Sequence, residues 1–158
     1  MLFMSNDKPK KVDWELIEGK LQNIQGALKN IEKRFCEVPD VDFFRSEAGE
    51  ERRDGICMLF QAVGETFKQI DDCANRTFLS RYPEIIWKDV IGFRNIIAHN
   101  YFDINELMLF NICQTHLPLL LATVNRMIED VEKIAEPPSW YTASGHKLDV
   151  FLRASLYY

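Results

Sequence analysis

The stretch RNIIAHNYF, from Arg94 to Phe102, places polar side chains capable of chemistry within an otherwise apolar segment. Arg94 offers a permanent positive charge in a planar fork that suits phosphate oxygens. His99, at the carboxyl end of a predicted helix, could hold a proton near neutral pH and release it as a general acid or base does. The two groups are sufficient for cleaving RNA without a metal: the 2′-hydroxyl loses its proton and attacks the adjacent phosphate, and the arginine stabilises the added negative charge.

Helical periodicity decides which of these side chains share a face. At about 100° per residue Asn95 and His99 lie on one face, so Asn95 is a candidate to orient His99 through a hydrogen bond. Arg94 and His99 are about 140° apart, so a single helix does not aim both groups at one point. No acidic pair accompanies them, and the C-x-x-H pair of Cys113 and His116 has no second pair of ligands. We therefore expect neither a metal site nor a cofactor.

Apolar residues spaced by three and four predict four amphipathic helices, and the RNIIAHNYF stretch ends the third. The first helix is predicted over residues 14–35, with Asp13 as its N-cap. The second begins near Ser46 and ends before Pro83. Pro83 itself suits the first position of the third helix, which runs to His99.

The fourth helix completes the predicted fold. Asp103 and Glu106 have the spacing of a capping box at its start, and Pro118 is expected to kink or loosen it. The sequence shows no strand pattern and no repeat, so we expect an all-α fold, an antiparallel four-helix bundle over residues 1–135. A short C-terminal extension, residues 136–158, follows. Its five aromatic residues are too many for a free tail, so we expect it to pack on the bundle or on a second subunit.

The composition is that of a soluble protein with one core. Of the 158 residues, 47% are hydrophobic and 27% are charged, and the net charge of −5 argues against a broad basic face that would coat a long duplex. A small basic pocket is compatible with it. The four cysteines include no C-x-x-C pair, which fits reduced thiols in a cytoplasm. The N-terminus lacks the apolar stretch of a signal peptide, and the longest apolar run, LPLLLATV, is shorter than a bilayer requires, so we expect a cytoplasmic protein without a membrane partner.

The spacing R-x4-H-x-Y, formed by Arg94, His99 and Tyr101, resembles the signature of the HEPN superfamily, in particular its HepT-like branch of bacterial ribonuclease toxins. The preceding PEIIWKDVIGFRN is similar to the Pro, Trp and Arg-Asn pattern of that branch, and VGE at residues 63–65 is similar to the Gly-Glu of its second helix. Phe93 stands where methionine is common. The resemblance covers roughly residues 12–135.

This resemblance implies a function and partners. It implies a homodimer in which Arg94 and His99 of both subunits line one cleft and cleave RNA, with a tRNA end or loop as a candidate, without a metal. It also implies a toxin-antitoxin system whose antitoxin is an MntA-like nucleotidyltransferase. That enzyme would attach AMP to Tyr101, and the added negative charge at the mouth of the cleft would repel RNA.

Other interpretations of the same residues stay open. In a non-catalytic adaptor for a nucleotidyltransferase, Arg94 and His99 would bind a nucleotide phosphate or a carboxylate of the partner, and the acidic net charge favours this interpretation slightly. In a purely structural bundle, His99 would only cap its helix. Glu65 could reach a basic group in the cleft, although a solvated helix face is its more ordinary role, and Trp87 is expected to be a core or interface anchor.

Overall fold

The computed structural model describes residues 11–135, and within this range the chain forms helices and their connections but no strand. The long helices are α1 (Trp14–Phe35), α2 (Glu47–Cys73), α3 (Trp87–His99) and α5 (Leu117–Ala135). Short 3-10 turns lie between them: η1 (Asp42–Arg45), η2 (Leu79–Arg81) and η3 (Tyr101–Asp103). Helix α4 (Glu106–Asn111) and the π-helical turn η4 (Ile112–His116) lead directly into α5. The predicted all-α fold of four packed helical segments is confirmed.

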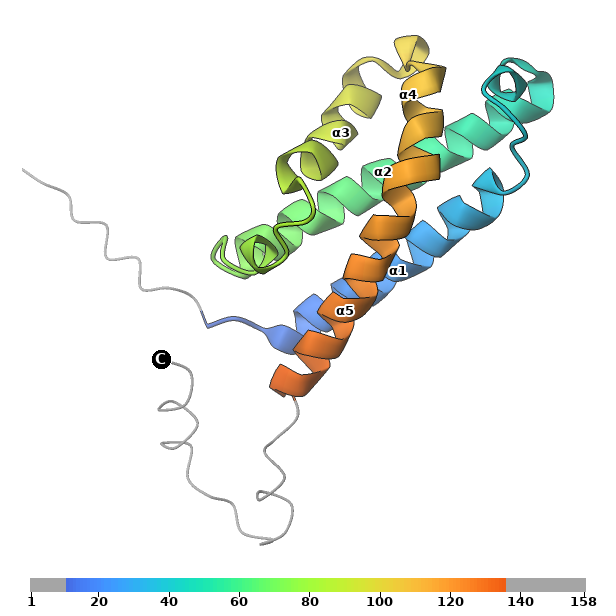
Figure 1. The fold of residues 1–158 in the computed structure, drawn as a ribbon. Coiled ribbons are helices and arrows are strands. Elements are labelled where there is room, and N and C mark those ends of the chain that lie inside the picture. The colour runs from blue at the N-terminus through green and yellow to red at the C-terminus, as the bar shows by residue number, and fades with distance from the viewer. Residues whose placement is uncertain (1–10, 136–158) are drawn as a thin grey trace, which may run out of the picture.

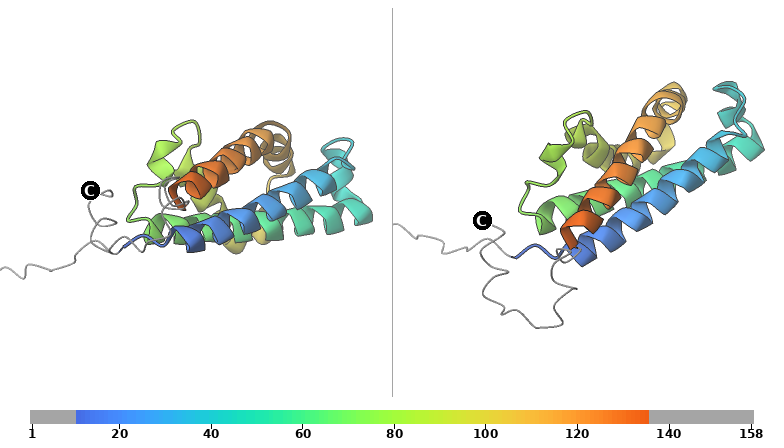
Figure 2. Two further views of the ribbon diagram at one scale, coloured as in Figure 1. Left: turned by 90° about the horizontal axis from the view of Figure 1, so that it is seen from below. Right: turned by 60° about the horizontal axis from the view of Figure 1, so that its bottom comes forward.

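Helices α1 and α2 are the longest elements, and they lie antiparallel and side by side (Figures 1 and 2). Helix α5 packs against α1, and α3 packs against α2, so the order of packing is α5, α1, α2, α3. The rod formed by α4, η4 and α5 starts at the end of the bundle where α3 finishes and runs back toward the start of α1 (Figure 1). The RNIIAHNYF stretch therefore lies at one end of the bundle, on the α2 side.

The predicted apolar stripes build the core. Burial of one large aliphatic side chain contributes roughly 1.5–3 kcal/mol, so these stripes, more than helix propensity, hold the helices together. The buried stripe of α1 consists of Ile17, Leu21, Ile24, Leu28 and Ile31. That of α2 includes Ile56, Phe60, Val63, Phe67 and Ile70, and that of α5 includes Leu117, Leu120, Val124, Met127 and Val131.

The contact between α2 and α3 positions the candidate site. The rings of Phe60 and Phe93 meet edge to face with their centroids 5.6 Å apart, and those of Phe67 and Trp87 are 4.9 Å apart. Aromatic pairs at such distances stabilise a contact beyond the area they bury. Trp87 also donates a hydrogen bond from its indole nitrogen to the carbonyl oxygen of Tyr82 at 3.0 Å. These contacts show Trp87 as an anchor of α3 on the core, as predicted.

The starts of the first two helices agree with the sequence prediction. The carboxylate of Asp13 accepts a hydrogen bond from the amide of Leu16 at 3.0 Å, and the hydroxyl of Ser46 accepts one from the amide of Gly49 at 3.1 Å. Each side chain satisfies an amide that the first turn of a helix leaves unpaired.

The starts of the other two helices were predicted wrongly. Helix α3 begins at Trp87, because the chain from Pro83 forms a turn in which the amide of Ile85 donates to the carbonyl of Tyr82 at 3.3 Å. This turn allows Tyr82 and Ile85 both to be buried. The N-cap of α4 is Asn105, whose side chain accepts from the amide of Met108 at 2.9 Å. Asp103 does not form the predicted capping box, because it is the last residue of η3.

Pro118 loosens the fourth helical segment, as predicted. Proline has no amide hydrogen to donate to the carbonyl four residues earlier, and its ring crowds that carbonyl. The turn before it is π-helical, and the amide of Leu117 donates to the carbonyl of Ile112, five residues back. The helix widens here without a break, so α4, η4 and α5 form one rod.

The rod from Glu106 to Ala135 is more apolar than its longest unbroken apolar run suggests. It has 30 residues and a mean hydropathy of 1.5 in its most apolar window, which by length and composition alone would allow it to cross a membrane. A core helix of a soluble protein can have the same properties, and residues such as Leu117, Val124 and Val131 are buried in this core. The exposed large apolar residues of the rod are Leu107 and Leu119, whose exposed fractions are 56% and 46%.

Candidate active site

Arg94 lies between α3 and α2, where a glycine leaves room for it. A Cβ atom on Gly64 of α2 would lie 3.1 Å from the Cβ of Arg94 and 3.1 Å from the carbonyl oxygen of Val90, closer than ordinary packing allows. The absence of a side chain at Gly64 therefore lets α3 approach α2 closely. The Arg94 side chain is largely buried by this approach, with 19% of its surface exposed.

Glu65 neutralises the guanidinium of Arg94. Its Oε2 atom forms an ion pair with Nη1 of Arg94, and the glutamate side chain is 47% exposed. From the sequence alone, a solvated helix face is the more ordinary role for Glu65, with contact to a basic group as the alternative. The structure shows the contact, because Glu65 pairs with Arg94.

The Nε atom of Arg94 is a buried donor without an acceptor among the residues that the structure describes. Leaving such a donor unpaired costs roughly 1–3 kcal/mol, so native proteins rarely tolerate it without a reason. An oxygen atom of a bound anion would remove this cost. Arg94 thus keeps a buried hydrogen-bond donor that no described residue satisfies.

His99 is the last residue of α3 and is exposed. Its exposure leaves the ring accessible from solvent. Neither ring nitrogen of His99 has a hydrogen-bond or ion-pair partner among the side chains that the structure describes.

The other two candidate residues flank His99. Asn95 is exposed one helical turn before it on the same face, and no hydrogen bond joins the two side chains. Tyr101 lies in η3, the turn that follows α3. The structure thus brings Arg94 into contact with Glu65, whereas His99 and Asn95 stand apart from this ion pair at the end of the helix.

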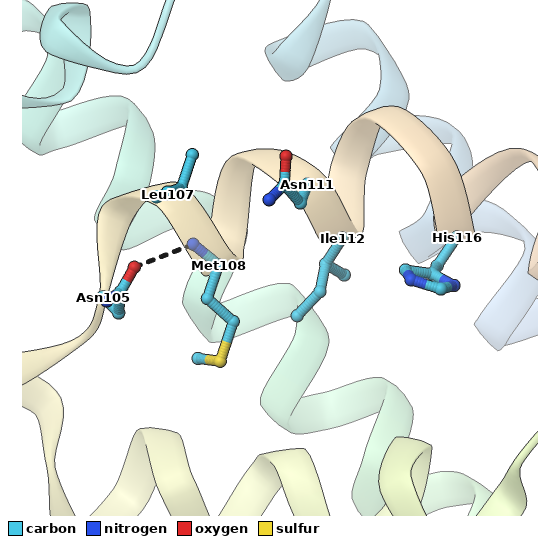
Figure 3. Close-up of a pocket in the computed structure, with 6 residues that line it drawn as sticks. All are labelled: Asn105, Leu107, Met108, Asn111, Ile112 and His116. Atoms are coloured by element: carbon cyan, nitrogen blue, oxygen red, sulfur yellow. Dashed lines mark hydrogen bonds between the residues drawn. The ribbon is translucent and has the colours of Figure 1, made fainter.

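Apolar side chains surround this end of the molecule. Ile96, Phe102 and Leu107 are exposed by 42%, 96% and 56% respectively. A shallow groove of about 400 Å³ lies along α4 and η4, lined by Asn105, Leu107, Met108, Asn111, Ile112 and His116. Figure 3 shows Met108, Ile112 and His116 pointing to one side of this segment and Leu107 and Asn111 to the other. Exposed large apolar side chains thus lie on α3, η3 and α4, all near the end of α3.

Histidine, cysteine and acidic side chains form no cluster of three that could hold a metal ion within residues 11–135. The cysteines in this range are unpaired, and Cys57 and Cys113 are buried. Burial raises the pKa of Cys57 to about 11 and that of Cys113 to about 12. Both groups are therefore neutral thiols near pH 7 and poor nucleophiles.

Comparison with known proteins identifies the family. Residues 24–127 match the family model described as "Ribonuclease HepT-like". The chain belongs to the HepT-like ribonuclease family. The matched region contains Arg94, His99 and Tyr101, and also the Glu65 that pairs with the arginine.

Two similar proteins come from Methanocaldococcus jannaschii. The first, "Putative RNase MJ1380", is 28% identical over 79 residues, which are 50% of this chain and 69% of that protein. The second, "Putative RNase MJ0127", is 22% identical over 105 residues, which are 66% of this chain and 84% of that protein. No solved structure matches this HepT-like chain.

Proposed function

We propose that this HepT-like protein is a metal-independent endoribonuclease in which Arg94 binds the scissile phosphate and His99 transfers the protons. The observation that carries this proposal is the state of Arg94: a largely buried guanidinium with an unpaired Nε donor, on the helix that ends in an accessible histidine. Membership in the HepT-like ribonuclease family supports RNA as the substrate.

The chemistry needs only these groups and the RNA. One imidazole accepts the proton of the 2′-hydroxyl, and the 2′-oxygen attacks the adjacent phosphorus. Arg94 stabilises the extra negative charge on the phosphate oxygens. The bond to the 5′-oxygen then breaks, and a second, protonated imidazole supplies the proton that this oxygen needs. The products are a 2′,3′-cyclic phosphate and a 5′-hydroxyl.

A homodimer would supply the second imidazole. Arg94 and His99 of one chain lie about 140° apart on α3, so one subunit does not surround a phosphate. A twofold axis beside α3 would place the two copies of each residue on opposite sides of a shared cleft. The exposed side chains of Ile96, Phe102 and Leu107, on the elements at this end of the bundle, would provide apolar surface for such a contact.

The biological setting proposed here is a cytoplasmic toxin-antitoxin pair. An MntA-like nucleotidyltransferase would transfer AMP to the hydroxyl of Tyr101, two residues after the end of α3. The new phosphate would place negative charge and bulk beside His99, and RNA would be repelled. Tyr101 would thus switch the nuclease off.

The experiment that tests this function is cleavage of tRNA and single-stranded RNA in the presence of EDTA. Purified wild type is compared with Arg94→Ala, His99→Ala and the control His116→Ala, which removes an exposed histidine from η4. Mass spectrometry first establishes that Tyr101 carries no AMP. Cyclic-phosphate ends are expected from wild type and His116→Ala alone; cleavage that persists in His99→Ala would refute the proposed mechanism.

A non-catalytic adaptor is the second candidate function. The net charge of −5 and the pairing of Arg94 with Glu65 favour it, because both reduce the attraction for RNA. This alternative predicts tight binding to a nucleotidyltransferase together with no RNA cleavage at any protein concentration. The EDTA assay therefore also separates the two candidates.

A further inference from the structure

The Gly64 and Glu65 pair of α2 contacts two different parts of Arg94. Gly64 faces the aliphatic stem, because a Cβ at this position would lie 3.1 Å from the Cβ and 3.7 Å from the Cγ of Arg94. Glu65 holds the charged head through its ion pair with Nη1. Two successive residues of α2 therefore determine both where the arginine side chain runs and how its guanidinium is turned.

The ion pair leaves one particular edge of the guanidinium without an acceptor among the described residues. In this planar group Nη1 lies on the side of the stem, and the N–H of Nε points to the same side as Nη2. Glu65 occupies Nη1, whereas Nε has no acceptor and is buried. The edge formed by Nε and Nη2 can donate two parallel hydrogen bonds to a carboxylate or a phosphate, which is the stronger, bidentate mode of arginine binding.

We propose that Glu65 is a positioning residue: it holds Arg94 by Nη1 so that the edge of Nε and Nη2 receives two oxygens of an RNA phosphodiester. This inference rests on the proposed function, in which Arg94 binds the scissile phosphate. Glu65 does not leave when RNA binds, because the phosphate takes the opposite edge of the guanidinium. The glutamate therefore acts on the reaction only through Arg94.

A role for Glu65 as a plain negative charge predicts the opposite effect on RNA affinity. Removing an acidic side chain near a phosphate site reduces repulsion, so charge alone predicts tighter binding in Glu65→Ala. Positioning predicts weaker binding, because the freed guanidinium loses its fixed orientation and must be ordered when the phosphate binds. The sign of the change in affinity thus separates the two roles.

The test measures binding of a fluorescent, single-stranded 2′-O-methyl oligoribonucleotide, which cannot be cleaved because its 2′-oxygen is blocked. The full chain is compared with Glu65→Ala, Glu65→Gln and the control Glu51→Gln, an exposed acid elsewhere on α2. We expect Glu65→Ala to bind roughly tenfold more weakly. Glu65→Gln should fall between it and wild type, because the amide oxygen still accepts from Nη1, and Glu51→Gln should bind no more weakly than wild type.

Several outcomes would overturn the inference. These are binding by Glu65→Ala that is as tight as wild type or tighter, and the absence of any binding by wild type. Circular dichroism and melting temperatures accompany each variant, and Glu65→Gln, which keeps the size of the side chain, provides the comparison should Glu65→Ala unfold.

The cleavage assay distinguishes failure of this inference from failure of the proposed function. If wild type cleaves RNA, Glu65→Ala should lower kcat by about 10- to 100-fold, as expected for a displaced catalytic group, with partial recovery in Glu65→Gln. Equal cleavage by wild type and Glu65→Ala would refute the role of Glu65 and leave the nuclease intact. If wild type does not cleave, the nuclease proposal fails, and the order of oligonucleotide affinities still decides whether Glu65 positions Arg94.

Discussion

At the scale of single residues, Arg94 is distinguished by shape as much as by charge. A lysine would bring the same charge but only one donor nitrogen, on a flexible stem, whereas the guanidinium has a fixed fork. One edge of this fork is committed to Glu65, and the other carries the buried Nε without an acceptor. The site therefore depends on a planar group with two separate edges.

The first prediction replaces this group while keeping its charge. Arg94→Lys should reduce RNA cleavage by roughly 100-fold, because the loss of one donor to a developing oxyanion has an effect of that order. The matched control is Arg76→Lys, the same change at a side chain that is 80% exposed. Initial rates of cleavage in EDTA measure both, and near-normal activity of Arg94→Lys would show that charge alone is sufficient.

The second prediction concerns the buried thiols. Their pKa values, about 11 for Cys57 and about 12 for Cys113, lie above the usual value, so at pH 8 only a very small fraction of either group is the reactive thiolate. Cys36 is exposed. Iodoacetamide at pH 8 should therefore modify Cys36 first, and Cys57 and Cys113 only after the protein unfolds. Timed labelling followed by peptide mass spectrometry measures the order, and equal rates for all three in the folded protein would contradict it.

At the scale of elements, the site is set by how closely α3 approaches α2. This approach depends on Gly64, which sits in the middle of α2 despite the entropic cost of a glycine in a helix. The glycine is explained by the stem of Arg94 and the carbonyl of Val90 that pass over it. Gly64 thus determines both how closely the two helices pack and where the guanidinium of Arg94 lies.

The third prediction tests this feature. In Gly64→Ala the new methyl group must displace Arg94 or α3, so we expect a net loss of about 1 kcal/mol in the free energy of unfolding, together with reduced RNA cleavage. The matched control is Gly26→Ala in α1, where a Cβ would meet no atom within 4 Å. That change should stabilise the protein by roughly 0.5–1 kcal/mol. Urea denaturation measures the free energy of unfolding of both variants. A Gly64→Ala protein that is more stable than wild type and fully active would contradict the prediction.

The sequence predicted the start of a helix correctly where the capping side chain bonds an amide within the first turn. Asp13 and Ser46 cap their helices as expected, because each side chain bonds an amide three residues away. The start of α3 depends instead on tertiary packing, because Tyr82 and Ile85 are buried in the core. The residues next to them in the sequence do not indicate this burial. Asn105 displaced Asp103 as a cap because η3 occupies the residues before it.

The same difference explains what the sequence revealed of the candidate site. Arg94 and His99 are predicted as site residues from their types and their spacing within a single helix. The ion pair between Glu65 and Arg94 joins two helices, and spacing along the chain does not give the relative rotation of α2 and α3. The unpaired Nε likewise follows from packing around the side chain and not from its neighbours in sequence.

At the scale of the whole molecule, a single chain leaves apolar surface uncovered at one end. Leu107, in the first turn of α4, is 56% exposed, and Ile96 and Phe102, near the end of α3, are 42% and 96% exposed. The end of α3 with His99 lies at the same end of the bundle (Figure 1). Association through this surface would bury it and bring a second His99 near the first. In the proposed dimer, the same contact would therefore stabilise the protein and complete the active site.

The last prediction places a charge in that surface. Leu107→Asp should convert a dimer of twice 18.5 kDa into a monomer, because an interface that buries an unpaired carboxylate is strongly disfavoured. Leu16→Asp is the matched control: the same substitution at a leucine that is 47% exposed near the start of α1, at the far end of the bundle. Light scattering coupled to gel filtration measures the masses, and the EDTA assay measures cleavage. We expect Leu107→Asp to lose dimerisation and cleavage together while Leu16→Asp keeps both; a Leu107→Asp monomer that still cleaves RNA would mean that one chain contains the whole active site.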